Sequence, residues 1–154
     1  MNNDLIRTYS YRISQANRTE LVVIIYDLAL DYLKEACEVE EIEEKRHAIV
    51  GAQRAIDELI VGLNMEFDLS KNLFVIYNFV KRRLISNFAR FDRDEVCKLQ
   101  NILLKLRQSF YEVSKVDESA SLMKNTQNVY AGLTYSKAGY CESISGNANR
   151  GYIV

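Results

Sequence analysis

The sequence has no proline and no tryptophan, only one histidine, and six glycines in 154 residues. Proline interrupts helices, so no such break divides the chain, and no glycine-rich linker separates two domains. Leucine, isoleucine, glutamate, lysine and arginine, which favour helices, are abundant instead. Composition and length therefore predict a single all-α domain that is large enough to bury a core.

The chain also lacks an excess of charge and a long apolar run. Its 20 lysines and arginines balance 21 aspartates and glutamates, unlike the basic footprint of a nucleic-acid-binding protein. The longest apolar run, residues 21–26, is far shorter than the roughly 20 residues that span a bilayer. No basic amphipathic segment marks a membrane surface, and the first residues lack the pattern of a secretory signal peptide. We therefore expect a cytoplasmic protein with no nucleic-acid partner and no membrane insertion.

Residues typical of catalytic and metal sites are scarce. The three cysteines, Cys37, Cys97 and Cys141, are far apart and form no Cys-x-x-Cys pair, so we expect reduced thiols without a metal or disulfide role. His47 follows Glu44 at the i, i+3 spacing of ferritin-like di-iron sites, but such sites need a second motif that the chain lacks. No phosphate-binding glycine loop or nucleophile elbow is present. We expect no cofactor, no metal and no enzyme activity.

One alternative from another functional class is a histidine phosphotransfer domain, which is also a four-helix bundle. Such domains carry an exposed histidine in the form His-x-Leu-Lys-Gly. The run from His47 to Gly51 has the glycine at the expected spacing. Val50, however, replaces the lysine that would steady a phosphoryl group. The simpler interpretation of His47 is a partly exposed helix residue.

Apolar periodicity divides the chain into a leader, a helical body and a tail. Residues 1–16 have the mixed composition of a short helix that must dock on the body. The body, residues 17–115, contains four amphipathic segments, two of which start with capping-box patterns, Asn17 with Glu20 and Asp92 with Glu95. Residues 116–154 are rich in serine, asparagine, glycine and tyrosine, and we expect an irregular, flexible tail there.

Short connections between these segments make consecutive helices antiparallel neighbours. We predict an up-down-up-down four-helix bundle crossing at about 20°, with a short N-terminal leader helix. The first long helix has two apolar sets where one buried face would suffice. One set is Leu21, Ile24, Ile25, Leu28 and Tyr32, and the other is Val22, Tyr26, Ala29 and Leu33. We expect the first set to hold the bundle and the second face to meet the leader or a partner.

Asp27 is a carboxylate in the middle of this apolar helix. If it is buried it needs a partner, because an unpaired buried carboxylate is costly. It either anchors the leader or a partner protein, or it is solvated or bonded to a neighbouring Tyr or Arg. The ten tyrosines of the chain suit contact surfaces because they combine apolar area with a polar tip. Each of Tyr26, Tyr32 and Tyr77 also fits a half-buried bundle position.

The order of these features resembles the flagellin export chaperones of the FliS family, over about residues 9–115. The first markers are Tyr11, Gln15, Glu20-Leu21 and the run Ile25-Tyr26-Asp27. Later markers include Ala52-Gln53, Leu63-Asn64, Asn72-Leu73, Arg83-Leu84 and Leu106-Arg107. The ordered set carries the resemblance, and no single marker does. The chain departs from the family at Arg18-Thr19, where Ser-Pro is frequent, and at Phe110 or Tyr111, where a tryptophan is usual.

The resemblance implies a cytoplasmic chaperone that binds the disordered C-terminal segment of flagellin, prevents its premature polymerisation and helps to deliver it to the flagellar export apparatus. A client that folds on binding needs a large, partly apolar receptor surface. We expect partner-contacting or gating side chains in the leader and in the first and third long helices. These are Tyr11, Ile13, Tyr26, Asp27, Tyr77 and Leu84. The leader, or the closing residues 152–154, could cover the client groove in the free protein.

Overall fold

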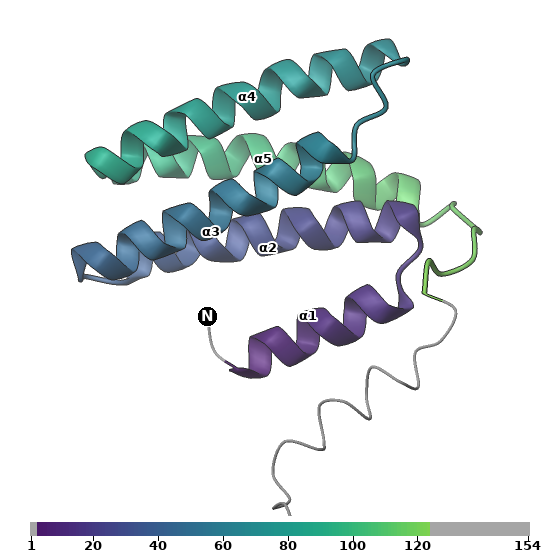
Figure 1. The fold of residues 1–154 in the computed structure, drawn as a ribbon, viewed down its shortest axis with the longest axis horizontal. Coiled ribbons are helices and arrows are strands. Elements are labelled where there is room, and N and C mark those ends of the chain that lie inside the picture. Colours follow the sequence, from purple (N-terminus) through teal and green to yellow (C-terminus); the bar gives the residue numbers. More distant parts are fainter. Residues whose placement is uncertain (1–2, 124–154) are drawn as a thin grey trace, which may run out of the picture. The chain divides into compact units, whose positions relative to one another are not determined.

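The computed structural model describes residues 3–123, which form five α-helices and no strand. The all-α fold class is confirmed. The helices are α1 (Asn3–Gln15), α2 (Arg18–Glu38), α3 (Ile42–Val61), α4 (Asp68–Ala89) and α5 (Arg93–Ser114). Consecutive helices alternate in direction, so the start of α2, the end of α3, the start of α4 and the end of α5 lie together (right in Figure 1). Most of the predicted tail, from residue 124 on, lies outside the described residues.

Side-chain caps define the starts of α2 and α5. The Asn17 side chain accepts the backbone N–H of Glu20 at 2.8 Å, and the Glu20 carboxylate accepts the backbone N–H of Asn17 at 2.9 Å. The predicted capping box at α2 is therefore confirmed. Asp92 caps α5 by accepting two backbone N–H groups of its first turn. The Glu95 side chain pairs with Arg83 of α4 instead of turning back to Asp92, because the neighbouring helix offers it a cation.

The main core lies between α2, α3, α4 and α5. Its largest fully buried side chains come from all four helices: Tyr26, Leu33, Ile49, Ile56, Tyr77, Val80, Leu84, Val96, Leu99 and Leu103. Several buried alanines of α2 and α3 belong to this core, and Gly51 of α3 is buried against the ring of Tyr32. Small residues at a helix contact allow the two backbones to approach closely. The glycine that fitted a phosphotransfer motif thus has a packing role.

The two apolar sets of α2 are divided differently from the prediction, although Ile25, Leu28 and Tyr32 of the first set do pack against the main core as expected. Tyr26 and Leu33, from the set assigned to a partner, lie in the main core. Ile24 and Leu21, from the set assigned to the bundle, pack in a smaller cluster with the leader helix, while Leu28 contacts both clusters. The leader therefore covers Leu21 and Ile24 of the first set, and this accounts for part of the excess apolar surface of α2.

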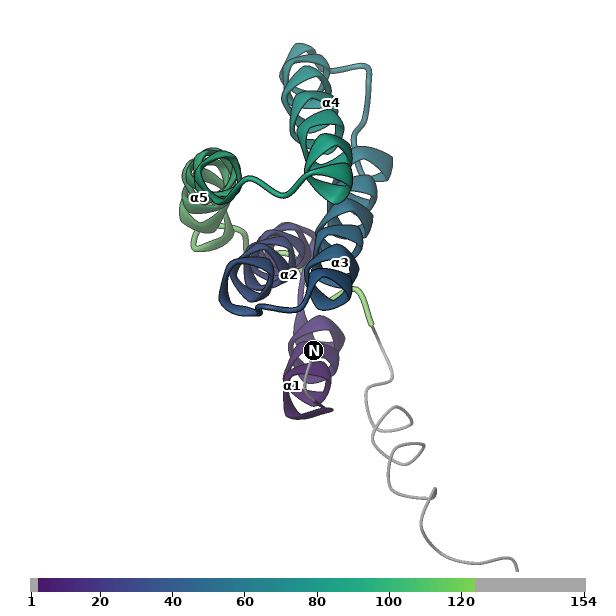
Figure 2. The ribbon, with the colours of Figure 1, turned by 90° about the vertical axis from the view of Figure 1, so that its left-hand side faces the viewer.

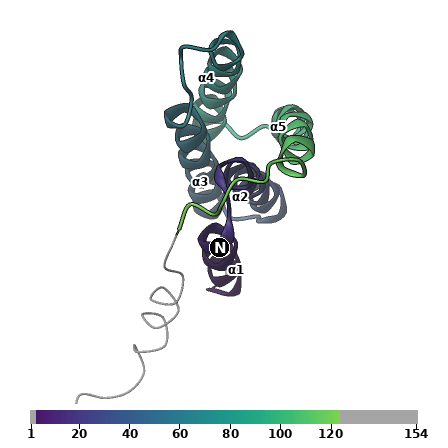
Figure 3. The same cartoon turned by 90° about the vertical axis from the view of Figure 1, so that its right-hand side faces the viewer.

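The helices do not pack equally on one another. The pair α2 and α3 is central, α4 packs mainly on α3, α5 packs mainly on α2, and α1 packs on α2. Direct contact between α4 and α5 is slight, and the two helices stand apart in Figure 2. After α5 the chain turns back across the start of α2 (Figure 3). This arrangement leaves side-chain-lined hollows at the edges of α2.

Candidate functional site

A groove opens where α2 starts, α3 ends and α4 begins, and we call it the α2–α4 groove. It has a volume of about 600 Å³. Its apolar lining comes from four helices, the α3–α4 connection and the segment after α5: Leu21, Val22, Ile25, Leu59, Leu63, Leu69, Leu73, Tyr77, Phe110 and Leu122. Arg18 and Glu58 add one charge of each sign. A hollow of this size and composition suits apolar side chains presented by a helical or extended segment.

A pair of tyrosines connects the groove to the core. Tyr77 of α4 lines the groove, and its hydroxyl is hydrogen-bonded to that of Tyr26 on α2. Both side chains are fully buried, and the ring of Phe110 packs on Tyr26 with 5.6 Å between ring centroids. Burial raises the pKa of both hydroxyls above the usual value, so both stay neutral. The groove therefore has an aromatic floor made by Tyr77 of α4 and Phe110 of α5, with Tyr26 of α2 packed beneath it.

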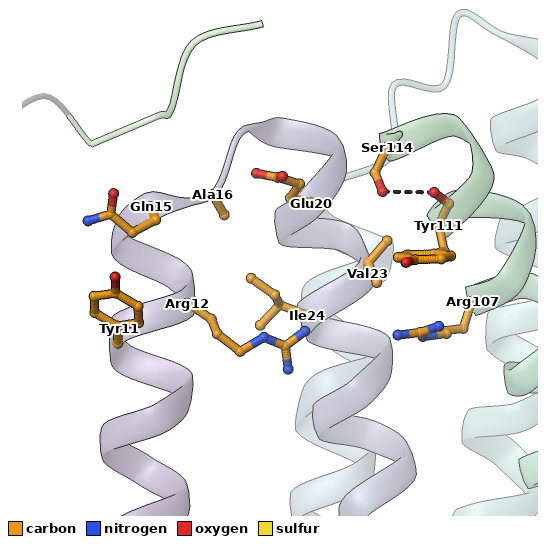
Figure 4. Close-up of a pocket in the computed structure, with 10 residues that line it drawn as sticks. All are labelled: Tyr11, Arg12, Gln15, Ala16, Glu20, Val23, Ile24, Arg107, Tyr111 and Ser114. Carbon is orange, nitrogen blue, oxygen red and sulfur yellow. Dashed lines mark hydrogen bonds between the residues drawn. The ribbon is translucent and has the colours of Figure 1, made fainter. Parts of the chain in front are cut away.

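A second hollow lies between α1, α2 and α5 (Figure 4). Arg12 of α1 and Arg107 of α5 extend toward one another across α2, and both bind Asp27. Arg12 Nη2 lies 2.6 Å from Asp27 Oδ2, and Arg107 Nε lies 2.9 Å from Asp27 Oδ1. The Arg107 guanidinium also lies 4.9 Å from the ring centre of Tyr111. Asp27 thus joins the leader helix and α5 to α2.

The leader is held on α2 by one apolar strip and a few polar contacts. The Tyr9 hydroxyl donates to Asp31 at 2.6 Å. Burial of Tyr9, together with this bond to a carboxylate, raises the pKa of the hydroxyl. Ile13 is half-buried in the cluster between α1 and α2. Tyr11 lies on the outer side of α1 and is 53% exposed.

The six side chains predicted as contacts do not form one site. Tyr77 lines the α2–α4 groove and Tyr26 is bonded to it in the core, whereas Tyr11 and Asp27 line the hollows beside α1. Ile13 packs between α1 and α2, and Leu84 is fully buried in the main core. None of these positions touches a partner in the structure of the single chain, so their contact with a partner stays a prediction.

Several groove residues were missed by the sequence reasoning. Leu69 is 67% exposed in the first turn of α4, and Leu63 lies in the connection before it. The sequence did hold a signal for these two residues, because each is an apolar residue beside the connection between two predicted helices. Leu122 gave no such signal, because it stands beside Met123 in the mainly polar segment assigned to the tail.

The part of the chain that the structure describes holds one histidine and two cysteines. His47 is exposed on α3. Cys37 and Cys97 are free thiols, and burial, together with the nearby Cys97 thiol, raises the pKa of Cys37. Between residues 3 and 123, no cluster of three His, Cys, Asp or Glu could hold a metal ion, and no helix is long and apolar enough to cross a membrane. Cys141 lies outside the described residues.

Comparison with known proteins relates these helices to flagellar proteins. Residues 1–117, which include all five helices, match the family described as flagellar protein FliS. The chain is also similar to the flagellar secretion chaperone FliS of Bacillus subtilis (strain 168). The two sequences are 24% identical over 101 residues, which cover 64% of this chain and 76% of the relative.

Proposed function

Because the chain belongs to the FliS family of flagellar proteins, we propose that it is a cytoplasmic flagellar export chaperone whose client is the C-terminal segment of flagellin. It would bind this segment while the segment is disordered, prevent premature polymerisation, and assist delivery to the flagellar secretion apparatus. The Bacillus subtilis relative is itself named a flagellar secretion chaperone. The chain would act by binding, without a cofactor or a catalytic step.

The α2–α4 groove is the observation that carries this proposal. A disordered client loses conformational entropy when it becomes ordered on binding. Burial of apolar side chains in the receptor must therefore supply the compensating free energy. The groove offers leucines above the aromatic floor of Tyr77 and Phe110. Outside the groove, Phe79 is a further apolar side chain of α4 that is 44% exposed. It lies one helical turn before Arg83, which pairs with Glu95 of α5.

We further propose that α2–α5 act as the antiparallel four-helix bundle that the family resemblance implies, opened on one side. In a closed bundle each helix packs against two neighbours. Here α4 packs on α3 and α5 on α2, with slight contact between α4 and α5. A client helix could supply the apolar contacts that these two helices do not make with each other. Tyr11, Ile13, Asp27 and Leu84 remain proposed contact or gating residues.

Titration of a peptide with the C-terminal sequence of flagellin tests the proposal. Calorimetry should show binding with a negative heat-capacity change, since apolar surface is buried, and circular dichroism should show a gain of helix. Leu69→Asp places a charge in the groove at an exposed position and should weaken binding by about tenfold, since a charge in an apolar contact costs free energy.

Val75→Asp is the matched control. Val75 is 65% exposed on the same helix and does not line the groove, so its replacement should leave the affinity unchanged. Absence of peptide binding, both by the wild-type chain and by a Leu122→Ala variant that removes a side chain from the groove, would reject the proposed client. Equal losses for the two variants would reject the groove as the binding site.

A further inference from the structure

The segment that follows α5 is fastened to the start of α2. The backbone N–H of Leu122 donates to the carbonyl oxygen of Ala16 at 3.0 Å. The Asn17 side-chain amide donates to the carbonyl oxygen of Asp117 at 3.2 Å, and the Thr19 hydroxyl donates to the Asp117 carboxylate. Hydrogen bonds at both ends of residues 117–122 therefore hold this segment across the α1–α2 connection, where Figure 3 shows it.

This fastening places one apolar side chain of the segment at the α2–α4 groove. Leu122 lines the groove together with Leu21 and Val22 of α2. Its neighbour Met123 does not line it. Leu122 is 49% exposed, so the contact buries only part of a leucine side chain. Since burial free energy scales with the apolar area removed from water, the contact is weak enough to be reversible.

We propose that residues 117–123 are an intramolecular ligand of the α2–α4 groove, and that a client segment displaces Leu122 when it binds. This inference rests on the proposed function, because it concerns regulation of the same groove. Leu122 and an aliphatic side chain of the client cannot occupy the same volume. The free chain would thus present a partly filled groove. Its apparent affinity for the client equals the affinity of the open groove multiplied by the fraction of molecules in which the groove is open.

The hydrogen bonds of the segment suit a contact that opens and closes. They join an exposed segment to groups at the start of α2, where water can replace each partner once the segment leaves. Asn17 keeps its separate role as the cap of α2, since its side-chain oxygen accepts from Glu20 while its amide nitrogen binds Asp117. Release of the segment therefore leaves the helices and the aromatic floor of the groove intact.

Substitution of Leu122 in the full chain tests the inference. Leu122→Ala removes the groove contact and should bind the flagellin C-terminal peptide roughly fivefold more tightly than the wild-type chain. Met123→Ala is the control, because Met123 is 43% exposed in the same segment but lies outside the groove, and it should bind like the wild type. Both positions lie outside the helices, so neither change removes a core side chain.

Amide exchange gives a second measurement. The Leu122 amide should be protected in the free chain and should exchange freely when the peptide is bound. Equal or weaker binding by Leu122→Ala, or an amide that stays protected in the complex, would overturn the inference and leave the proposed function standing. Absence of binding by all three proteins would reject the proposed client and, with it, the competition. Binding by Leu122→Ala alone would support the inference and indicate near-complete closure.

Discussion

At the residue scale, the hydroxyl pair of Tyr26 and Tyr77 shows how a polar contact fixes one arrangement of α2 and α4. Each hydroxyl is fully buried and bonded to the other. A buried polar group that loses its partner costs about 1–3 kcal/mol, whereas removal of both partners is close to neutral. The pair therefore favours the one register in which the two hydroxyls meet.

We predict strong coupling between Tyr26→Phe and Tyr77→Phe. Tyr77→Phe leaves the Tyr26 hydroxyl buried without a partner and should lower the free energy of unfolding by about 1–3 kcal/mol. The double variant removes both hydroxyls and should lose less than the sum of the single losses. Urea unfolding of the four proteins measures the coupling, and additive losses would contradict it.

The sequence limited the possible roles of Asp27 to a few but did not distinguish among them. The sequence left open an anchor for the leader or a partner, a solvated position, or a bond to a neighbouring Tyr or Arg. In the structure it binds Arg12, 15 positions away, and Arg107, 80 positions away. It thus anchors the leader and also pairs with an arginine of the body. No local pattern relates three residues so far apart.

At the element scale, the close packing of α2 on α3 depends on Gly51. A Cβ at this position would lie 2.5 Å from Cε1 of Tyr32, well inside contact distance. Gly62, at the end of α3, is different. A Cβ there would lie 3.5 Å from the nearest atom, a backbone oxygen, and φ is −72°, which any residue adopts. Replacement of these two glycines by alanine is therefore expected to have opposite effects on stability.

Gly51→Ala should destabilise the fold although alanine favours helices. The clash with the Tyr32 ring is expected to cost about 1–3 kcal/mol, which exceeds the gain in helix propensity. Gly62→Ala should be neutral or stabilising by about 0.5 kcal/mol, because it restricts the unfolded chain without strain. Thermal unfolding of both variants gives the comparison. Equal melting temperatures for Gly51→Ala and the wild-type chain would contradict the prediction and show that Tyr32 moves aside at little cost.

The packing of the two apolar sets of α2 is a second feature at the element scale. Periodicity found both apolar sets, but their assignment was right only in part: Ile25 packs on the main core as expected, whereas Tyr26 also enters that core and Leu21 packs toward α1. A helix pattern records which residues share a face. It does not record which neighbouring helix covers that face, because this depends on the apolar stripes of the other helices.

At the scale of the whole described structure, residues 3–123, buried tyrosines should limit stability at alkaline pH. Burial raises the pKa of Tyr9, Tyr26 and Tyr77 above the usual value of 10. In the unfolded chain these hydroxyls ionise near pH 10, whereas in the folded chain they stay protonated. A pKa raised by folding gives stability that is complete below pH 10 and is lost as pH rises further.

The free energy of unfolding should therefore fall as pH rises above 10, and urea unfolding at a series of pH values would measure this. The double variant Tyr26→Phe/Tyr77→Phe should show a shallower fall, because fewer raised groups remain. Tyrosinate absorbance provides the check. Full ionisation of the tyrosines near pH 10, with the helical signal intact, would contradict the prediction.

The openness between α4 and α5 is another property of the assembled helices. The sequence predicted amphipathic helices in the right order, with the leader ahead of them. It did not predict that α5 would pack on α2 with slight contact to α4. The amphipathic stripes of α4 and α5 each fit a closed or an open bundle, so their residues alone do not distinguish the two.

The sequence by itself determined the all-α class, the capping box of Asn17 with Glu20, and the family to which the chain belongs. These depend on composition, on periodicity and on residues close together in the chain. Only the tertiary structure decided which face of α2 enters the core, which arginines bind Asp27, and that Leu122 lies at the α2–α4 groove. The physical reason is that these contacts join residues distant in sequence, and their energies depend on how all the helices pack together.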